Sequence, residues 1–148
     1  MGAKVRGLKG TYRYLTFGLL TLLISTSLAF STFGGQFEDA VFAYERGDYA
    51  KAYRLFKPLA EQGVPAAQYN LGLMYADGLG VPQDHVLAHM WINLATSRYP
   101  ASEKEKQEGA AKIRDLAASM MTPAQIAEAE RLAREWKPKR RGESGLSL

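Results

Sequence analysis

Apolar residues recur at helical spacing in two neighbouring segments between residues 66 and 95. In the first segment, Ala67, Leu71 and Met74 fall on one helical face. In the second, the apolar residues follow an i, i+3, i+4, i+7 pattern, namely Ala88, Trp91, Ile92 and Ala95. The intervening stretch DGLGVPQD contains two glycines and a proline, which favour a turn. The pattern therefore predicts a hairpin of two short amphipathic helices.

The same pattern occurs once before, in a less regular form. Before the turn, the matching positions are Ala43, Tyr44 and Gly47 against Met74, Tyr75 and Gly78, at an offset of 31 residues. After the turn, they are Asp48, Ala52, Leu55, Phe56 and Leu59 against Asp84, Ala88, Trp91, Ile92 and Ala95, at an offset of 36. The second copy has a longer turn, which repeats tolerate easily. Each hairpin must bury its apolar face on a neighbour, as stacked helical repeats do.

Capping residues and prolines set the expected helix limits. The helices are expected at about 37–46, 49–62, 66–76 and 84–97. Asp48 and Asp84 occupy N-cap positions, and Gly63 is placed to end the second helix. Pro58 is expected to kink or shorten that second helix, because proline lacks the backbone N–H.

Two further helices are expected in residues 102–136. Ser102 with Glu105 has the spacing of a capping box, and Thr122 before Pro123 is a second helix start. Their apolar stripes are Ile113, Leu116, Ala117 and Met120 in the first, and Ile126, Ala129, Leu132, Ala133 and Trp136 in the second. We interpret the pair as a hairpin that caps the stack with a polar outer face. The basic tail, residues 137–148, is expected to be disordered.

The segment from Ala66 to Ala95 resembles the Sel-one-like repeat (SLR) family, a relative of the tetratricopeptide repeat. The matching pattern is A-x-YNLG-x-MY-x-x-G-x-GV-x-x-D-x-x-x-A-x-x-W, and it is weaker over residues 40–63. The resemblance implies an all-α fold, an α/α solenoid of short helical hairpins, with two repeats in residues 37–98. It also implies a scaffold for protein–protein contacts. The signature or structural positions are Ala52, Phe56, Leu71, Gly72, Tyr75, Gly78, Gly80, Val81, Asp84, Ala88 and Trp91.

The first 29 residues have the layout of a secretory signal peptide. A basic region precedes an apolar stretch from Leu15 to Phe30, and small residues at Ser27 and Ala29 favour cleavage after Ala29. Residues 30–36 then form a linker. Left uncut, the uncharged stretch between Arg13 and Glu38 is long enough to cross a bilayer, so a retained anchor is the alternative. After cleavage the body is expected to be periplasmic or secreted. With a retained anchor it is expected to stay at the inner membrane and face the periplasm.

The charge distribution argues against nucleic acid as the main partner. The net charge is +4, but four basic residues and no acid precede Tyr14, and four basic residues and one acid follow Trp136. The body between them carries 11 basic and 14 acidic residues, whereas a nucleic-acid surface needs clustered positive charge. The chain has no cysteine, which excludes disulfides and thiolate zinc sites.

No pattern for catalysis, a cofactor or a metal stands out. His85 and His89 have the i, i+4 spacing of metal ligands, but a third ligand is missing, and we expect both to be exposed. The carboxylates of the fifth helix alternate with lysines, which is typical of a solvated surface, and no G-x-S-x-G turn or phosphate loop is present. The sequence favours a protein that is not an enzyme.

Tyr69, Asn70 and Asp77 are the candidate partner-binding residues. They lie on the first helix of the second hairpin, where such helices would form a groove for a peptide. The leading hypothesis is an exported scaffold that binds a protein or peptide in the bacterial envelope. One alternative is a membrane-tethered structural or assembly factor. Another is a small hydrolase acting on cell-wall or β-lactam substrates, by analogy with the cysteine-rich branch of the family, although a nucleophile–base pair is lacking.

Overall fold

The computed structural model describes residues 35–140, and within this range the regular elements are helices. They comprise a helix over residues 35–45, α2 (Tyr49–Glu61), α3 (Pro65–Asp77), α4 (His85–Arg98), the 3₁₀ turn η1 (Ala101–Glu103), α5 (Lys104–Ser119) and α6 (Pro123–Glu135). The chain divides into two compact units, residues 1–36 and 37–148, and the fold described below is that of the second. The predicted signal peptide or anchor lies outside the described residues, as does most of the linker.

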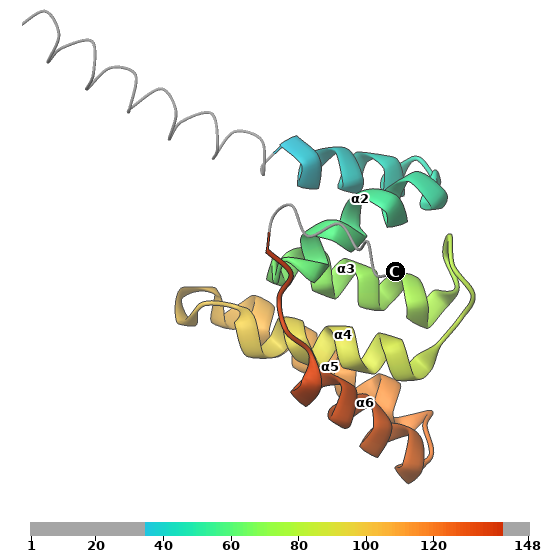
Figure 1. Cartoon of the computed structure of the whole chain (residues 1–148), viewed down its shortest axis with the longest axis vertical. Coiled ribbons are helices and arrows are strands. Elements are labelled where there is room, and N and C mark those ends of the chain that lie inside the picture. Colours follow the sequence, from blue (N-terminus) through green and yellow to red (C-terminus); the bar gives the residue numbers. More distant parts are fainter. Residues whose placement is uncertain (1–34, 141–148) are drawn as a thin grey trace, which may run out of the picture. The chain divides into compact units, whose positions relative to one another are not determined.

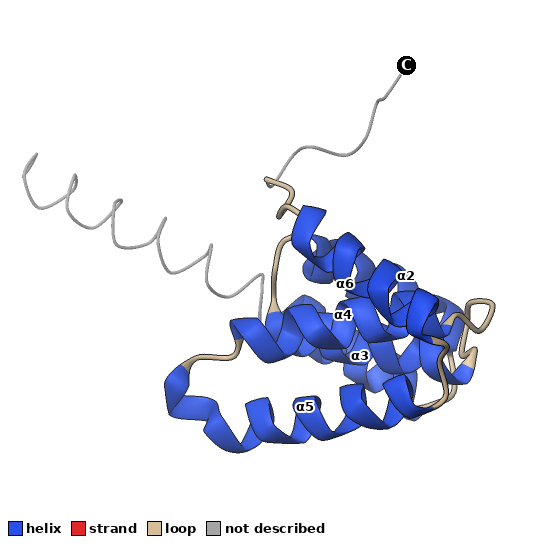
Figure 2. Ribbon diagram, turned by 90° about the horizontal axis from the view of Figure 1, so that it is seen from below, coloured by secondary structure: helices blue, strands red, loops and turns tan. Residues whose placement is uncertain are grey.

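The helices stack in chain order. α2 packs on α3, α3 pairs most extensively with α4, and both α5 and α6 pack on α4 (Figure 1). The view in Figure 2 shows α3, α4 and α6 running beside one another, with α5 along one side. The predicted all-α fold, an α/α solenoid of short hairpins, is confirmed.

The helix starts follow from local capping chemistry. The Asp48 Oδ1 atom accepts a hydrogen bond from the Lys51 N–H at 3.1 Å, and the Asp84 Oδ1 atom accepts one from the Leu87 N–H at 3.0 Å. Thr122 forms a full capping box with Gln125 at the start of α6. These three predicted N-caps are therefore confirmed.

Two local predictions are wrong. α2 runs through Pro58 to Glu61, so the proline does not shorten it, while a kink at Pro58 stays a prediction. Ser102 does not begin a helix with a capping box, because the Pro100 carbonyl accepts the Glu103 N–H at 2.8 Å and closes a 3₁₀ turn. The helix α5 begins after this turn, and its N-cap, Glu103, makes no side-chain capping bond.

Six of the eleven signature residues lie in the core. Phe56 is fully buried, Trp91 is 7% exposed, and Ala52, Leu71, Gly72 and Ala88 are buried as well. Gly72 allows α3 and α4 to approach closely, since a Cβ atom there would lie 2.5 Å from the Ile92 Cγ1 atom. The hairpins therefore bury their apolar faces on one another, as the pattern predicted.

The predicted apolar stripe of α5 is only partly buried. Ala117 is buried, but Leu116 is 60% exposed and Met120 is 61% exposed. Burial of both residues requires a close neighbour on each side of α5, and α6 packs mainly on α4 instead. In this respect, the two C-terminal helices differ from the compact hairpin that we expected.

Trp136 and the start of the basic tail contact both helical hairpins. The Trp136 ring packs edge-on against Trp91 at 6.1 Å between centroids, and the Arg98 guanidinium lies 4.4 Å from the Trp136 centroid. The Lys139 N–H donates to the Glu61 carbonyl at 2.8 Å, and the two side chains form an ion pair at 3.2 Å. The predicted disorder therefore does not hold for residues 137–140, while residues 141–148 lie outside the described part.

Candidate partner-binding groove

An open groove of about 270 Å³ lies between α3 and α5. Tyr69 lines it from α3, Tyr99 from the end of α4, and Lys106, Gly109 and Ala110 from α5. The groove is thus lined by two aromatic rings and, on α5, by the small residues Gly109 and Ala110. Such a combination of aromatic surface and free volume suits an inserted apolar side chain.

The polar groups of this groove are largely hydrogen-bond donors. The hydroxyls of Tyr69 and Tyr99 make no hydrogen bond to other residues of the described chain. Burial raises the pKa of the Tyr99 hydroxyl, and Tyr69 and Glu103 raise it further. Tyr99 therefore keeps its proton at neutral pH and can donate it to a bound carbonyl group.

The other tyrosines of the two hairpins contact one another. The hydroxyls of Tyr53 and Tyr75 form a hydrogen bond at 3.1 Å, which with burial raises the pKa of Tyr75. Tyr44 packs edge-on against Tyr49, with centroids 5.3 Å apart. Only the first of these contacts uses the hydroxyls, so Tyr69 and Tyr99 differ from Tyr53 and Tyr75 in making no hydroxyl hydrogen bond within the described residues.

The three residues predicted to bind a partner lie in different surroundings. Tyr69 lines the groove. The Asn70 side chain donates to the Ala66 carbonyl of its own helix at 2.8 Å, and it does not line the groove. Asp77 is exposed at the end of α3; burial raises the pKa of Tyr44, and the charge of Asp77 raises it further. A binding role for these residues stays a prediction.

Sequence reasoning missed Tyr99, Lys106, Gly109 and Ala110. Tyr99 falls between the helices expected at 84–97 and from residue 102, and we assigned the first half of α5 to a solvated surface. The one available signal was Gly109, a glycine inside a helix with no turn nearby.

A comparison with protein families matches the chain from the first described helix to the end of α4. The family model described as Sel1 repeat matches residues 35–64 and residues 65–98. Residues 35–98 are therefore two Sel1 repeats. The boundary between them falls in the turn between α2 and α3, so each repeat is one helical hairpin. Neither a curated protein nor a solved structure shows a significant match.

The Sel1 repeats form a helical scaffold, and the comparisons identify no catalytic family for the chain.

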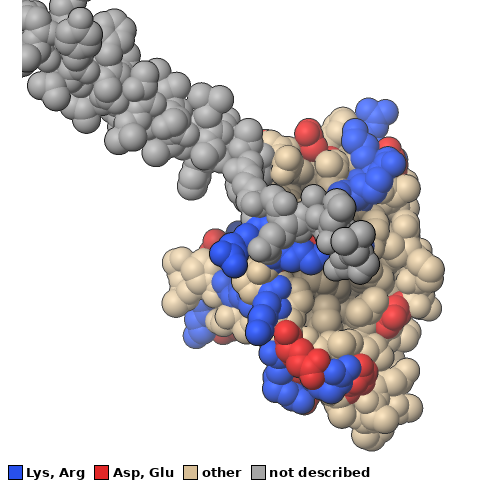
Figure 3. Space-filling model, viewed as in Figure 1, with Lys and Arg blue, Asp and Glu red and all other residues tan. Residues whose placement is uncertain are grey.

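The carboxylates at the start of α5 form ion pairs with neighbouring lysines. Glu103 pairs with Lys106 at 2.7 Å, and Glu108 pairs with Lys104 at 3.6 Å. On the face shown in Figure 3, Lys and Arg gather around α2 and the described end of the chain, while both signs mix over α6. Between residues 35 and 140, no helix is long and apolar enough to span a membrane.

A second hollow, of about 320 Å³, lies within the first Sel1 repeat, at the turn before α2. Phe42, Ala43, Arg46, Asp48 and Lys51 line it. Its polar groups are largely engaged, because Asp48 caps α2 and the Arg46 guanidinium lies 5.3 Å from the centre of the Phe42 ring. The groove between α3 and α5 is therefore the better candidate for a binding site.

The second Sel1 repeat carries both histidines, and the prediction that they are exposed is wrong. His89 is 4% exposed and His85 is half-buried, because α5 and α6 both pack on α4. The Nδ1 atoms of both rings are buried and have no hydrogen-bond partner among the described residues. The same part of the chain contains no group of three or more side chains that could hold a metal ion.

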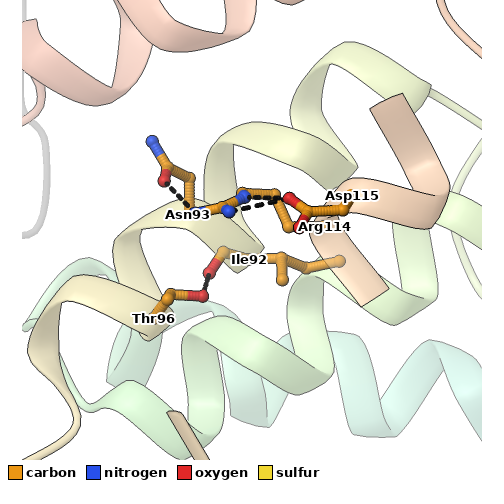
Figure 4. Close-up of polar contacts among 5 residues, drawn as sticks. All are labelled: Ile92, Asn93, Thr96, Arg114 and Asp115. Atoms are coloured by element: carbon orange, nitrogen blue, oxygen red, sulfur yellow. Dashed lines mark hydrogen bonds and ion pairs between the residues drawn. The ribbon is translucent and has the colours of Figure 1, made fainter. Parts of the chain in front are cut away.

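Arg114 connects α5 to α4 beside His89. Its guanidinium binds the Asp115 carboxylate at 2.7 Å and contacts the Asn93 side chain of α4 at 3.4 Å (Figure 4). One turn further along α4, the Thr96 hydroxyl donates to the Ile92 carbonyl at 2.9 Å. These contacts place a fixed positive charge close to the buried imidazole.

Acidification is expected to destabilise the fold through His89. Burial, followed by the charge of Arg114, lowers the His89 pKa from its ordinary value of 6.5, although Glu130 and Asp115 oppose this. The unfolded chain then binds a proton more readily, so stability falls as the pH drops below about 6.5 towards the folded-state pKa. Urea unfolding at about pH 7.5 and pH 5.5 measures the effect. Between these two pH values, His89→Gln should lose less stability than the wild type. An equal loss in both proteins would refute the assignment of the effect to His89.

Gly109→Ala is expected to stabilise the protein by about 1 kcal/mol, because glycine is a poor residue for a helix interior. A Cβ atom at Gly109 meets nothing within 4 Å, so the change causes no clash. Thermal or urea unfolding gives the free energy of unfolding. Gly72→Ala is the contrasting variant, since its Cβ would collide with Ile92 and should lower stability. A destabilised Gly109→Ala protein would contradict the description of the groove as open space.

Proposed function

We propose that the chain is an exported scaffold that binds a protein or peptide partner at the groove between α3 and α5, in the bacterial envelope. Sel1 repeats are helical scaffolds that typically mediate protein–protein interaction. The observation that carries the location is the groove itself, with two tyrosine hydroxyls that have no partner in the described chain. Tyrosine is among the residues most enriched at binding hot spots.

The glycine in α5 supports the same assignment. Gly109 has no positive φ angle, and no neighbouring atom lies where its Cβ would be placed. Neither the backbone nor packing therefore requires a glycine here, yet it lowers the stability of α5. Its effect is to keep the groove open opposite Tyr69 and Tyr99. Residues that lower local stability without a packing or backbone reason are found mainly at functional sites.

Site-specific crosslinking tests the location. A photoreactive amino acid is placed at Tyr69, in the groove, and in a separate protein at Arg54, an exposed position on α2. Irradiation of intact cells should give a discrete crosslinked product from Tyr69 and none of the same mass from Arg54. The same product from both positions, or no product from Tyr69, would count against the groove.

Export is supported by the sequence alone, through the basic start, the apolar stretch and the small residues before Phe30. The mature N-terminus tests it directly. Sequencing of the protein purified from cells should begin at Phe30 if the segment is cleaved after Ala29. A chain that begins at Met1 and stays with the membrane fraction supports the tethered alternative. An uncut chain in the cytoplasmic fraction contradicts export in both forms.

A further inference from the structure

We propose that the groove between α3 and α5 takes a proline-rich segment of the partner in the polyproline II conformation. This inference rests on the proposed function and specifies the chemistry of its ligand. It follows from three features of the groove: its supply of hydrogen-bond donors, its aromatic surface and its size.

The donors in the groove have no matching backbone acceptors. Tyr69 and Tyr99 offer hydroxyls without partners in the described chain, and Lys106 offers an ammonium group. The groove lies between helices, whose interior carbonyls are used within each helix. A strand-like ligand needs backbone donors and acceptors in alternation, as at a sheet edge, and the helices beside this groove offer no such row. A proline-rich ligand has exposed carbonyls and few N–H groups, so its needs match what the groove offers.

The surface and size of the groove favour the same ligand. The rings of Tyr69 and Tyr99 are half-buried, and proline-rich segments dock in grooves lined by aromatic residues. A volume of about 270 Å³ holds one or two side chains, whereas a helix is about 10–12 Å across. Gly109 and Ala110 leave room for a pyrrolidine ring between α5 and the tyrosines. A polyproline II helix is also formed before binding, so little conformational entropy is lost.

The charges at the rim fit an uncharged ligand. Lys106 is paired with Glu103 at 2.7 Å, so the two charges offset one another, and the Lys106 side chain remains exposed enough to turn towards a bound carbonyl. A proline-rich segment without charged side chains meets no unpaired charge at this rim.

Peptide titration tests the proposal. The full-length chain, purified in detergent, is titrated by calorimetry with a nine-residue polyproline peptide and with an alanine-based helical peptide of equal length. The polyproline peptide should bind and the helical peptide should bind at least tenfold more weakly. Equal binding of the two peptides, or no binding of the polyproline peptide at millimolar concentration, would overturn the proposal.

Three variants locate the binding. Gly109→Leu fills the groove and should weaken polyproline binding at least tenfold. Tyr99→Phe removes one donor and should weaken it about threefold to tenfold. Tyr53→Phe is the matched control, because that hydroxyl bonds Tyr75 and does not line the groove, and its affinity should be unchanged. Polyproline binding that survives in Gly109→Leu would place the peptide elsewhere and overturn the assignment.

The outcomes separate this inference from the proposed function. A specific crosslink from Tyr69 to a partner that lacks any proline-rich segment would leave the groove as the binding site and refute the ligand class. If Tyr69 gives no crosslink in cells but polyproline binds the purified protein and Gly109→Leu weakens that binding, the ligand class stands and the proposed function is refuted.

Discussion

Gly80→Ala is expected to lower the free energy of unfolding by about 3 kcal/mol, through two separate effects. Gly80 has a φ angle of +73°, in the left-handed region that costs a residue with a Cβ about 1 kcal/mol. Its Cβ would also lie 2.5 Å from the Tyr49 carbonyl oxygen, so the turn between α3 and α4 must move away from α2. Because that turn belongs to the second repeat and Tyr49 to the first, the change weakens the contact between the repeats.

Gly47→Ala is the matched control for this prediction. Gly47 has a φ angle of +78°, but a Cβ atom there meets nothing within 4 Å. It should therefore lose only the conformational part, about 1 kcal/mol. Urea unfolding of both variants gives the two free energies. Equal losses would show that the turn does not pack against α2 as described.

Phe56→Ala is expected to destabilise the protein by about 3–5 kcal/mol. Phe56 is fully buried in α2, and its ring packs edge-on against Phe37 with centroids 5.7 Å apart. Truncation removes apolar contacts and leaves a cavity that rigid helices fill only partly. The loss is a large fraction of the stability of a typical small domain, so much of the protein should be unfolded at elevated temperature.

Phe42→Ala is the comparison for Phe56. Phe42 is 57% exposed in the same repeat, and its main contact is the Arg46 guanidinium above its ring. Its truncation should lower stability by no more than about 1 kcal/mol. Thermal unfolding followed by circular dichroism distinguishes the two variants. A similar shift for both would contradict the placement of Phe56 in the core between the hairpins.

Features set by neighbours in the sequence could be predicted from it. Asp48, Asp84 and Thr122 cap their helices through bonds to residues three positions ahead, so the local pattern contains all the necessary information. The burial of Phe56 and Trp91 also followed from the pattern, since an amphipathic hairpin has one apolar face to cover.

Features set by the arrangement of distant helices could not be predicted. Leu116 has the same apolar spacing as buried residues, but its exposure depends on which helix packs beside α5. His89 is buried because two later helices lie on α4, and Lys139 is held by Glu61, a residue far from it in the sequence. The groove is similar, because its residues come from α3, the end of α4 and α5. Only Tyr69 among them was singled out from the sequence.

The crosslinking yield from Tyr69 in the Gly109→Leu protein tests the central claim most directly. The claim is that the open groove between α3 and α5 is the surface that binds a partner. A Cβ atom at position 109 meets nothing within 4 Å, and leucine favours the helix, so we expect the variant to fill the groove and to fold at least as stably as the wild type. We predict that the specific crosslink disappears while the unfolding midpoint is unchanged or higher. A crosslink of undiminished yield in this stable variant would contradict the account.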